Sequence, residues 1–310
     1  MKILIVANHN KGKFVPFIVE QANALIQQGI EVGYFGVHGK GISGYLSNRS
    51  SLIEKIRDYH PELIHAHYGL SGLLANLQRI VPVVTTYHGS DIHSGGRNLL
   101  FSRVSMWLSA YNIFVSEDLQ KQAGSHSSGQ CVLPCGIDTV AIYPIDRAEA
   151  RKKLGWDANG RYVLFAGAFD NAVKNSPLAK DALALIDNAH LVEMRGFTRD
   201  QVNLVMNAAN CLLMTSHREG SPQVVKEAMV CGTPVVSVDV GDVKDVTAGI
   251  EGCFITSYDV NDVARSVEQT FAFQGKTAGR QRIIERGLSN ELVAKRIIEI
   301  YNIVSNKNSK

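Results

Sequence analysis

The sequence predicts an α/β protein that consists of two doubly wound domains in tandem. Short apolar runs rich in β-branched residues alternate with helical segments, which is typical of a parallel sheet covered by helices on both faces. The series begins twice, because the runs that start at Lys2 and at Arg161 each lead into a loop that contains glycine. A length of 310 residues is also comfortable for two domains of ordinary size.

The elements follow from this alternation. The first half is expected to contain strands at residues 2–7, 31–36, 63–67, 83–87, 111–116 and 130–134, with helices among others at 16–28, 50–59 and 71–79. The second half is expected to contain strands at residues 161–167, 190–195, 211–216, 234–238 and 252–256, with helices near 176–187, 199–208, 222–230 and 259–273. The two domains are therefore expected at residues 1–145 and 146–288.

The composition indicates a cytoplasmic globular protein. The 32 basic and 29 acidic side chains leave a net charge of +3, which is too small to indicate a nucleic-acid partner. Five scattered cysteines, mostly inside apolar runs, indicate buried reduced thiols. The first apolar run is too short for a signal peptide, and no apolar stretch approaches the ~20 residues that span a membrane.

The most specific pattern lies at residues 216–229, where a strand ends, a tight loop follows and a helix begins. We expect Ser221 to be the N-cap and Pro222 the first helical residue, so that free backbone N–H groups and the helix dipole form an anion site. Glu219 and Glu227 lie eight positions apart, so one can reach sugar hydroxyls while the other binds a ribose. A loop charge and a solvated helix residue are the alternative, but the strand, the capped helix and the run that follows Gly232 agree on a site.

This segment resembles the Glu-x7-Glu signature of the family 4 retaining glycosyltransferases of the GT-B type. Residues 219–241 are similar to members that build teichuronic acid and other surface polysaccharides. The resemblance covers nearly the whole chain, since it continues in residues 61–67, 88–91, 134–138 and 165–175 and at Tyr301 in the final helix.

The resemblance implies a GT-B fold, with two Rossmann-like domains facing across a cleft and a C-terminal helix at residues 289–305 that packs back on the first domain. The implied function is retaining, metal-independent transfer of a sugar from a nucleotide-diphosphate sugar, UDP- or GDP-linked, to a saccharide or lipid-linked saccharide. The implied setting is cell-surface polysaccharide biosynthesis. No cofactor and no metal are expected.

The resemblance also implies site residues. The catalytic residues would be His88, Lys174 and Glu219, and the donor-binding residues would be Gly12, Lys174, Glu219, Gly220, Ser221, Pro222 and Glu227. Lys174 and a helix N-terminus can stabilise a departing diphosphate without a metal ion. The sequence has no Asp-x-Asp triplet, which is the usual metal clamp of the other transferase fold.

Several of these positions also have simpler interpretations. Taken alone, Lys174 reads as a surface charge and His88 as a buried histidine bonded to backbone. We expect His65 and His67, on one strand, to point to opposite faces of the sheet and therefore not to share a metal ion. Ala168 stands where many family members have Arg, which removes one cation from the diphosphate site, and Arg218 or Lys226 could replace it.

Other classes of function stay open at this stage. Residues 39–44 match the Gly-x-Gly-x-x-Gly pattern of nicotinamide oxidoreductases, but they follow the second strand, so we interpret them as a flexible loop. A non-hydrolysing nucleotide-sugar 2-epimerase would share the architecture, and a two-domain solute-binding protein would be exported. Residues 99–108, with Arg97 and Arg103, allow peripheral contact with the inner membrane face; a helix packed on its own sheet is the favoured alternative.

Overall fold

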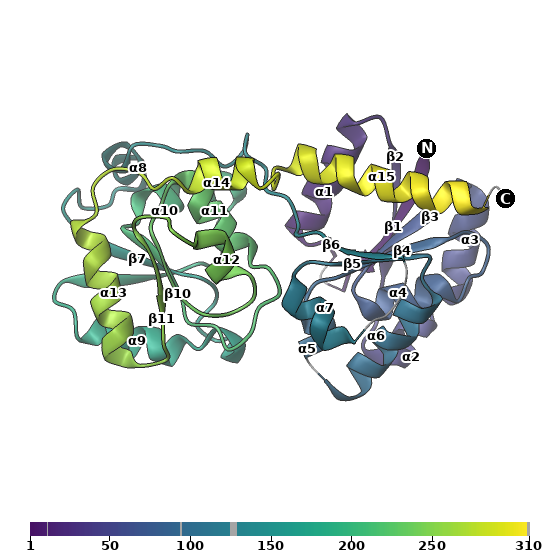
Figure 1. The fold of residues 1–310 in the computed structure, drawn as a ribbon, viewed down its shortest axis with the longest axis horizontal. Helices are drawn as coiled ribbons and strands as arrows, with labels where there is room; N and C mark the ends of the chain where they lie inside the picture. Colours follow the sequence, from purple (N-terminus) through teal and green to yellow (C-terminus); the bar gives the residue numbers. More distant parts are fainter. Residues whose placement is uncertain (11, 94, 125–128, 309–310) are drawn as a thin grey trace. The chain divides into compact units, whose positions relative to one another are not determined.

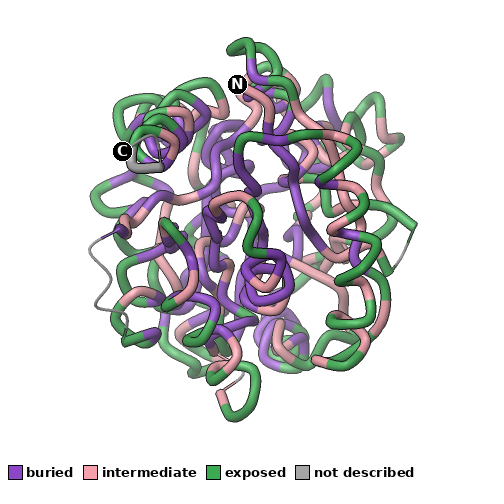
Figure 2. Tube along the Cα trace, turned by 90° about the vertical axis from the view of Figure 1, so that its right-hand side faces the viewer, coloured by how far each residue is buried: buried purple, intermediate pink, exposed green. Residues whose placement is uncertain are grey.

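The computed structural model describes residues 1–10, 12–93, 95–124 and 129–308, which form two compact units (Figure 1). Unit 1 comprises Met1–Gly136 and Asn290–Lys310, and unit 2 comprises Ile137–Ser289. Each unit has its own parallel sheet and its own buried core, as the α/β interpretation requires. Figure 2 shows the buried segments at the interior and the exposed segments along the outer turns.

The sheet of unit 1 has six parallel strands in the order β2-β1-β3-β4-β5-β6. The strands are β1 (Lys2–Asn8), β2 (Glu31–Val37), β3 (Leu63–His67), β4 (Val83–Tyr87), β5 (Tyr111–Phe114) and β6 (Gln130–Val132). The helices are α1 (Pro16–Gln27), α2 (Gly41–Leu46), α3 (Arg49–Tyr59), α4 (Gly69–Asn76), α5 (Ser90–His93), α6 (Gly96–Leu108), α7 (Glu117–Ala123) and α15 (Asn290–Asn308). Residues 3–7 of β1 are fully buried because helices cover both faces of the sheet.

The C-terminal helix α15 completes the core of unit 1. Its residues Val293, Ile297 and Tyr301 lie in one buried cluster with Ile3 and Ile5 of β1, and it packs along α1. Residues that are more than 280 positions apart in the sequence therefore share one core.

Helix α6 packs on its own unit and also exposes an apolar strip. Gly72 of α4 allows a close approach, because a Cβ there would lie 2.4 Å from Ser105 Oγ of α6. The opposite side of α6 exposes Leu100, Val104 and Trp107, with exposed fractions of 58%, 39% and 83%. In the part of the chain that the structure describes, no helix has the length and apolar character needed to cross a membrane.

The glycine-rich segment after β2 is not a flexible loop. Gly39 and Gly44 pack against each other, since a Cβ on Gly39 would lie 2.8 Å from Gly44 Cα. Helix α2 begins at Gly41, and the Asn10 side chain bonds both the N–H and the carbonyl of Gly39 at 2.7 Å. The glycines therefore form a tight turn that leads into α2, and the prediction of a flexible loop at residues 39–44 is wrong.

The sheet of unit 2 has five parallel strands in the order β11-β10-β9-β7-β8. The strands are β7 (Arg161–Phe165), β8 (Ala189–Glu193), β9 (Cys211–Met214), β10 (Val235–Val238) and β11 (Cys253–Thr256). The helices are α8 (Arg147–Leu154), the 3-10 turn η1 (Ala172–Lys174), α9 (Ser176–Ala184), α10 (Arg199–Ala208), α11 (Gln223–Cys231), α12 (Val243–Thr247), α13 (Val260–Ala272) and α14 (Gly279–Glu285).

The strand order fixes where a ligand can bind. From β7 the chain moves outward to β8 and then returns to β9 on the other side of β7, so the connections leave these two neighbouring strands in opposite directions. In open α/β sheets such a switch point opens a crevice beyond the carboxyl ends of the strands. The segments that follow β7 and β9 are therefore the first place to look for a site in unit 2.

Candidate functional site

Backbone and hydroxyl bonds tie together the two loops at the switch point of unit 2. The Thr215 hydroxyl, just after β9, lies 2.9 Å from the carbonyl oxygens of both Lys174 and Asn175, which follow β7. The His217 amide donates to the Val173 carbonyl at 2.9 Å. The loop that carries Glu219 is thus held against the turn that carries Lys174.

Lys174 and Glu219 form an ion pair at this junction. Lys174 Nζ lies 2.6 Å from Glu219 Oε1, and the two side chains are 21% and 15% exposed. Gly167 makes room for the lysine, because a Cβ there would lie 2.7 Å from Lys174 Cγ. The structure therefore brings together two residues that the sequence analysis assigned to one site, 45 positions apart.

Glu227 pairs with a residue that the sequence analysis missed. Its Oε1 accepts a hydrogen bond from Arg199 Nη1, and the side chains of the two residues are 28% (Arg199) and 11% (Glu227) exposed. Arg199 is the first residue of α10, whose start is fixed by a capping box between Thr198 and Gln201. No local pattern identifies this arginine, since the pair depends on how α10 packs beside α11.

The start of α11 differs from the prediction. The helix begins at Gln223, with Pro222 in an extended conformation at the boundary and no side-chain cap. Ser221 does not cap the helix, because its hydroxyl donates to Asp242 Oδ2 instead. Gly241 presses on the same loop, since a Cβ there would lie 2.7 Å from the Gly220 carbonyl oxygen.

The two suggested replacements for the missing family arginine differ in their exposure. Lys226 is fully buried inside unit 2, where its charge opposes the effect of burial, which raises the pKa of the Asp242 carboxyl. Its full burial makes Lys226 less accessible to a ligand than the exposed Arg218. Arg218 is exposed in the loop next to Glu219, and its role stays a prediction.

In unit 1 the site residues follow β1 and β4. Gly12 has φ of +71°, a left-handed conformation that favours glycine, and a Cβ there would meet no atom within 4 Å. Backbone N–H groups of His88 and Gly89 donate to Asp91 Oδ1, and that of Gly69 donates to Oδ2. Asp91 therefore organises the turn that presents His88.

His88 belongs to a stack of three histidines. His88 Nε2 lies 3.0 Å from His67 Nδ1, and His88 Nδ1 lies 3.7 Å from the Sγ of Cys135. The rings of His65 and His67 stack at 4.5 Å between centroids, so the expectation of opposite faces is wrong. Residues two positions apart on a strand share a face. His65 Nδ1 in turn lies 2.6 Å from the Tyr301 hydroxyl of α15.

Burial makes this stack neutral. It lowers the pKa of His65 and of His88 to about 3, and it lowers that of His67 well below its usual value, assisted by the charges of its two neighbours. Burial also raises the pKa of Asp91 to about 6, against the opposing effect of its backbone hydrogen bonds. Uncharged His88 can exchange hydrogen bonds but is not a cation at neutral pH.

The charges in unit 2 suit a diphosphate. Lys174 and Arg199 each carry a carboxylate partner that an anionic ligand could replace. Helix α11 begins four residues after Glu219, and the backbone N–H groups of its first turn add a partial positive charge there. Among the described residues, no three His, Cys, Asp or Glu side chains gather in a way that could hold a metal ion. Metal independence stays a prediction.

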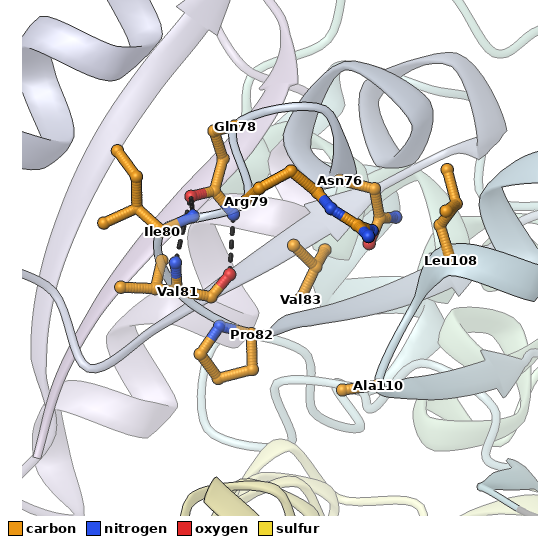
Figure 3. A pocket seen from close by; sticks show the side chains of 9 residues that line it. All are labelled: Asn76, Gln78, Arg79, Ile80, Val81, Pro82, Val83, Leu108 and Ala110. Carbon is orange, nitrogen blue, oxygen red and sulfur yellow. Dashed lines mark hydrogen bonds between the residues drawn. The ribbon is translucent and has the colours of Figure 1, made fainter.

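A cavity of about 380 Å³ in unit 1 lies elsewhere, at the start of β4 (Figure 3). Gln78 closes the turn beside it, because its Oε1 accepts from the Val81 amide at 3.0 Å and its Nε2 donates to the Val81 carbonyl at 2.6 Å. Arg79 is the single charged residue of its lining, so this cavity does not resemble a catalytic site.

Comparisons with known proteins assign both units to glycosyltransferase families. Residues 15–140 match the profile of the family described as "Glycosyltransferase Family 4", and residues 160–272 match that of "Glycosyl transferases group 1". The chain belongs to these glycosyltransferases and has the GT-B fold.

Two relatives illustrate the range of the family. The chain is 28% identical to the D-inositol 3-phosphate glycosyltransferase of Mycolicibacterium gilvum over 48% of this chain and 40% of that protein. It is 30% identical to TuaC of Bacillus subtilis, named as a candidate teichuronic acid biosynthesis glycosyltransferase, over 62% of this chain and 57% of that protein. The chain thus spans about two fifths to three fifths of the length of these two curated relatives.

Solved structures resemble the whole chain. Sucrose-phosphate synthase of Thermosynechococcus elongatus superposes with a TM-score of 0.82 at 18% identity, covering 98% of this chain and 99% of that one. HepE of Anabaena in complex with UDP gives 0.76 at 19% identity, covering 97% of this chain and all of that one. At these identities the likeness establishes the fold alone.

The histidine stack predicts an acid-sensitive unit 1. Below pH 6.5 the histidines bind protons in the unfolded state but stay neutral in the folded state. The free energy of unfolding of unit 1 should therefore be highest above pH 6.5 and decrease as the pH falls toward about 3. Asp91 acts oppositely below about pH 6, because its folded form binds a proton first. Near pH 5 the unfolded state therefore binds about two protons more than the folded state, three at the histidines less one at Asp91. Each of these protons lowers the free energy of unfolding by about 1.4 kcal/mol per pH unit of acidification.

The pH dependence can be measured by urea denaturation with pulsed hydrogen exchange at pH 7 and pH 5. Peptides from each unit report the stability of that unit separately. Unit 2 is the internal control, since His190 and His217 are exposed. His67→Gln should reduce the dependence by about one proton. Equal losses in both units would contradict the assignment to the stack.

Proposed function

We propose that this chain is a retaining, metal-independent glycosyltransferase that uses a nucleotide-diphosphate sugar as donor. The observation that carries the proposal is the Lys174–Glu219 ion pair at the β7/β9 switch point, beside the start of α11. The family profiles and the solved complex of HepE with UDP support a nucleotide-sugar donor. The family also supports cell-surface polysaccharide biosynthesis as the setting.

In this proposal the donor displaces the ion pair. Lys174 leaves Glu219 and binds the diphosphate, whose negative charge grows as the bond from the anomeric carbon to the phosphate oxygen breaks. Glu219 is then free to accept hydrogen bonds from sugar hydroxyls. Because the pair already satisfies both charges, neither residue is left buried and unpaired while the donor is absent.

Glu227 has a different task. We assign it to the ribose, whose two hydroxyls can donate to its carboxylate, while Arg199 fixes the orientation of that carboxylate. The role of His88 at the transferred sugar follows from the resemblance. We propose that a sugar hydroxyl takes the place of Cys135 Sγ, whose contact with His88 Nδ1 is weak.

Retention is proposed to follow a same-face route. The bond from the anomeric carbon to the donor phosphate breaks, the bond to the acceptor oxygen forms on the same face, and the acceptor proton passes to the departing phosphate oxygen. Glu219 is not assigned as a nucleophile in this route. Its negative charge lies beside the carbon that becomes cationic, which favours the transition state over the bound donor.

The first experiment tests the reaction class and the absence of a metal. Purified protein is incubated with UDP- and GDP-sugars and saccharide acceptors, with and without EDTA, and the products are identified by mass spectrometry and NMR. Transfer with retained configuration should survive EDTA. Activity that is abolished by the chelator and restored by manganese would sink the metal-independent mechanism, and a 2-epimer formed without acceptor would favour the epimerase of the same fold.

Substitution of Glu227 and of Glu219 should change different kinetic parameters. Glu227→Gln should mainly raise the donor KM, by roughly tenfold, because ribose binding is the same in the ground and transition states. Glu219→Gln should mainly lower kcat, by about 10²-fold, because its charge acts on the transition state. Steady-state kinetics measures both, with circular dichroism to verify folding and Glu268→Gln, on the exposed side of α13, as control. If both variants change KM alone, the chemistry depends on other residues.

We assign a saccharide or lipid-linked saccharide as the acceptor.

We also propose peripheral membrane contact through Leu100, Val104 and Trp107, because an exposed apolar strip on a surface helix fits the boundary of a bilayer. Co-sedimentation with phosphatidylglycerol-containing vesicles should fall severalfold in Trp107→Ser. The Tyr143→Ser variant, at an exposed site in unit 2, should bind as the unchanged protein does. Equal binding by all three proteins would remove the strip from the proposal.

A further inference from the structure

Unit 2 contains a second cavity, at the end of its sheet opposite to Lys174 and Glu219. It has a volume of about 680 Å³ and is lined by the start of α8, the start of β7 and the segment that follows α13. Figure 1 labels these three elements within unit 2. Arg161, the first residue of β7, lines it. At a rise of about 3.3 Å per residue, the five residues of β7 separate this cavity from the carboxyl end of the strand by ~13 Å or more.

The lining is strongly cationic. Arg147, Arg151, Arg161 and Lys276 contribute four positive charges, and Asp146 contributes the single negative charge. The Asp146 carboxylate is already used, because it caps α8 by accepting from the Glu149 amide at 3.1 Å. Among the described residues, none of the four cations forms an ion pair with a carboxylate.

The four cations are not equivalent. Arg151 is 4% exposed and bonds the Ala208 and Ala158 carbonyls and the Asn210 amide oxygen, so it serves as a structural support. Arg161 donates to the Asp187 carbonyl at 3.2 Å and lies over the Phe271 ring. Both side chains thus already have partners in unit 2 while their charges line the cavity.

Arg147 and Lys276 are the cations available to a ligand. For the Arg147 guanidinium, no hydrogen-bond partner occurs in the described part of the chain. Lys276 Nζ makes one hydrogen bond, to Asn207 Oδ1 at 2.7 Å, which leaves two of its three protons for another acceptor.

The proximity of these two charges has a cost. Burial, with a smaller contribution from the charge of Arg147, lowers the pKa of Lys276 to about 8, while Cys231 and Asp146 act in the opposite direction. Two positive charges held together at a partly buried site destabilise the protein unless an anion joins them. A bound anion would remove this repulsion.

We propose that this cavity is a second binding site, which takes a small phosphorylated organic molecule. The phosphate would lie between Arg147 and Lys276, close to the first turn of α8, which runs for eight residues from Arg147. Ile145 and the Phe271 ring give an apolar wall for the organic part. The volume lies in the range of about 300–1,000 Å³ that is typical of small-molecule sites.

Ribose 5-phosphate is a suitable probe, with orthophosphate at equal ionic strength as the comparison. Isothermal titration should show ribose 5-phosphate binding more tightly than orthophosphate, and binding should persist in Lys174→Ala, which impairs the proposed donor site. The Arg147→Gln/Lys276→Gln variant should lose at least tenfold in affinity. The matched control is Lys153→Gln/Arg265→Gln, two exposed cations of unit 2 outside the cavity.

The pH dependence separates this site from a general charge effect. The affinity for ribose 5-phosphate should fall severalfold between pH 7 and pH 9 as Lys276 loses its proton, because the phosphate monoester, with a second pKa of about 6, is already mostly doubly charged at pH 7. The double variant should show no such fall, and without ligand it should melt no lower than the unchanged protein, because it loses a repulsion. Binding that disappears in Lys174→Ala, or that survives in the double variant, would overturn the proposal. So would orthophosphate binding as tightly as ribose 5-phosphate.

Discussion

The hydroxyl of Thr215 is the interaction on which the candidate site of unit 2 depends. It contacts two successive carbonyl oxygens of the turn after β7, and so it fixes the spacing between that turn and the loop after β9. The Lys174–Glu219 pair can form only if these two segments keep this spacing. The order of the strands brings the segments side by side, and one buried hydroxyl sets their register.

In unit 1, a single carboxylate likewise fixes the turn that carries a candidate site residue. Asp91 gathers three backbone amides, and this fixes the turn after β4 from which His88 projects. His67 and His65 continue the stack along one face of the sheet to Tyr301, so a helix from the far end of the chain supports the ring that the resemblance assigns to the sugar. Burial keeps the whole stack uncharged, which suits an exchange of neutral hydrogen bonds with hydroxyl groups.

The sequence predicted the parts of this architecture that depend on local periodicity. The eleven strands in the described part of the chain were all expected close to their observed positions, because parallel strands in a doubly covered sheet leave near-continuous apolar runs. Glu219, Glu227 and Lys174 were found because each stands next to a strand end or a helix start. The partnership of Arg199 with Glu227 was not accessible, since it depends on the packing of two helices. The role of Ser221 was misjudged for a similar reason: Asp242, 21 residues later, competes for its hydroxyl.

The position of α15 has a consequence for biosynthesis. Unit 2 consists of one uninterrupted stretch, whereas the core of unit 1 includes Val293, Tyr301 and Val304. On the ribosome, unit 2 can therefore reach its final packing before unit 1 has received its last helix. Until residues near 304 emerge from the exit tunnel, the apolar face that α15 covers, including Ile3 and Leu25, is left open. Unit 1 is therefore the first unit to be synthesised and the last to complete its core.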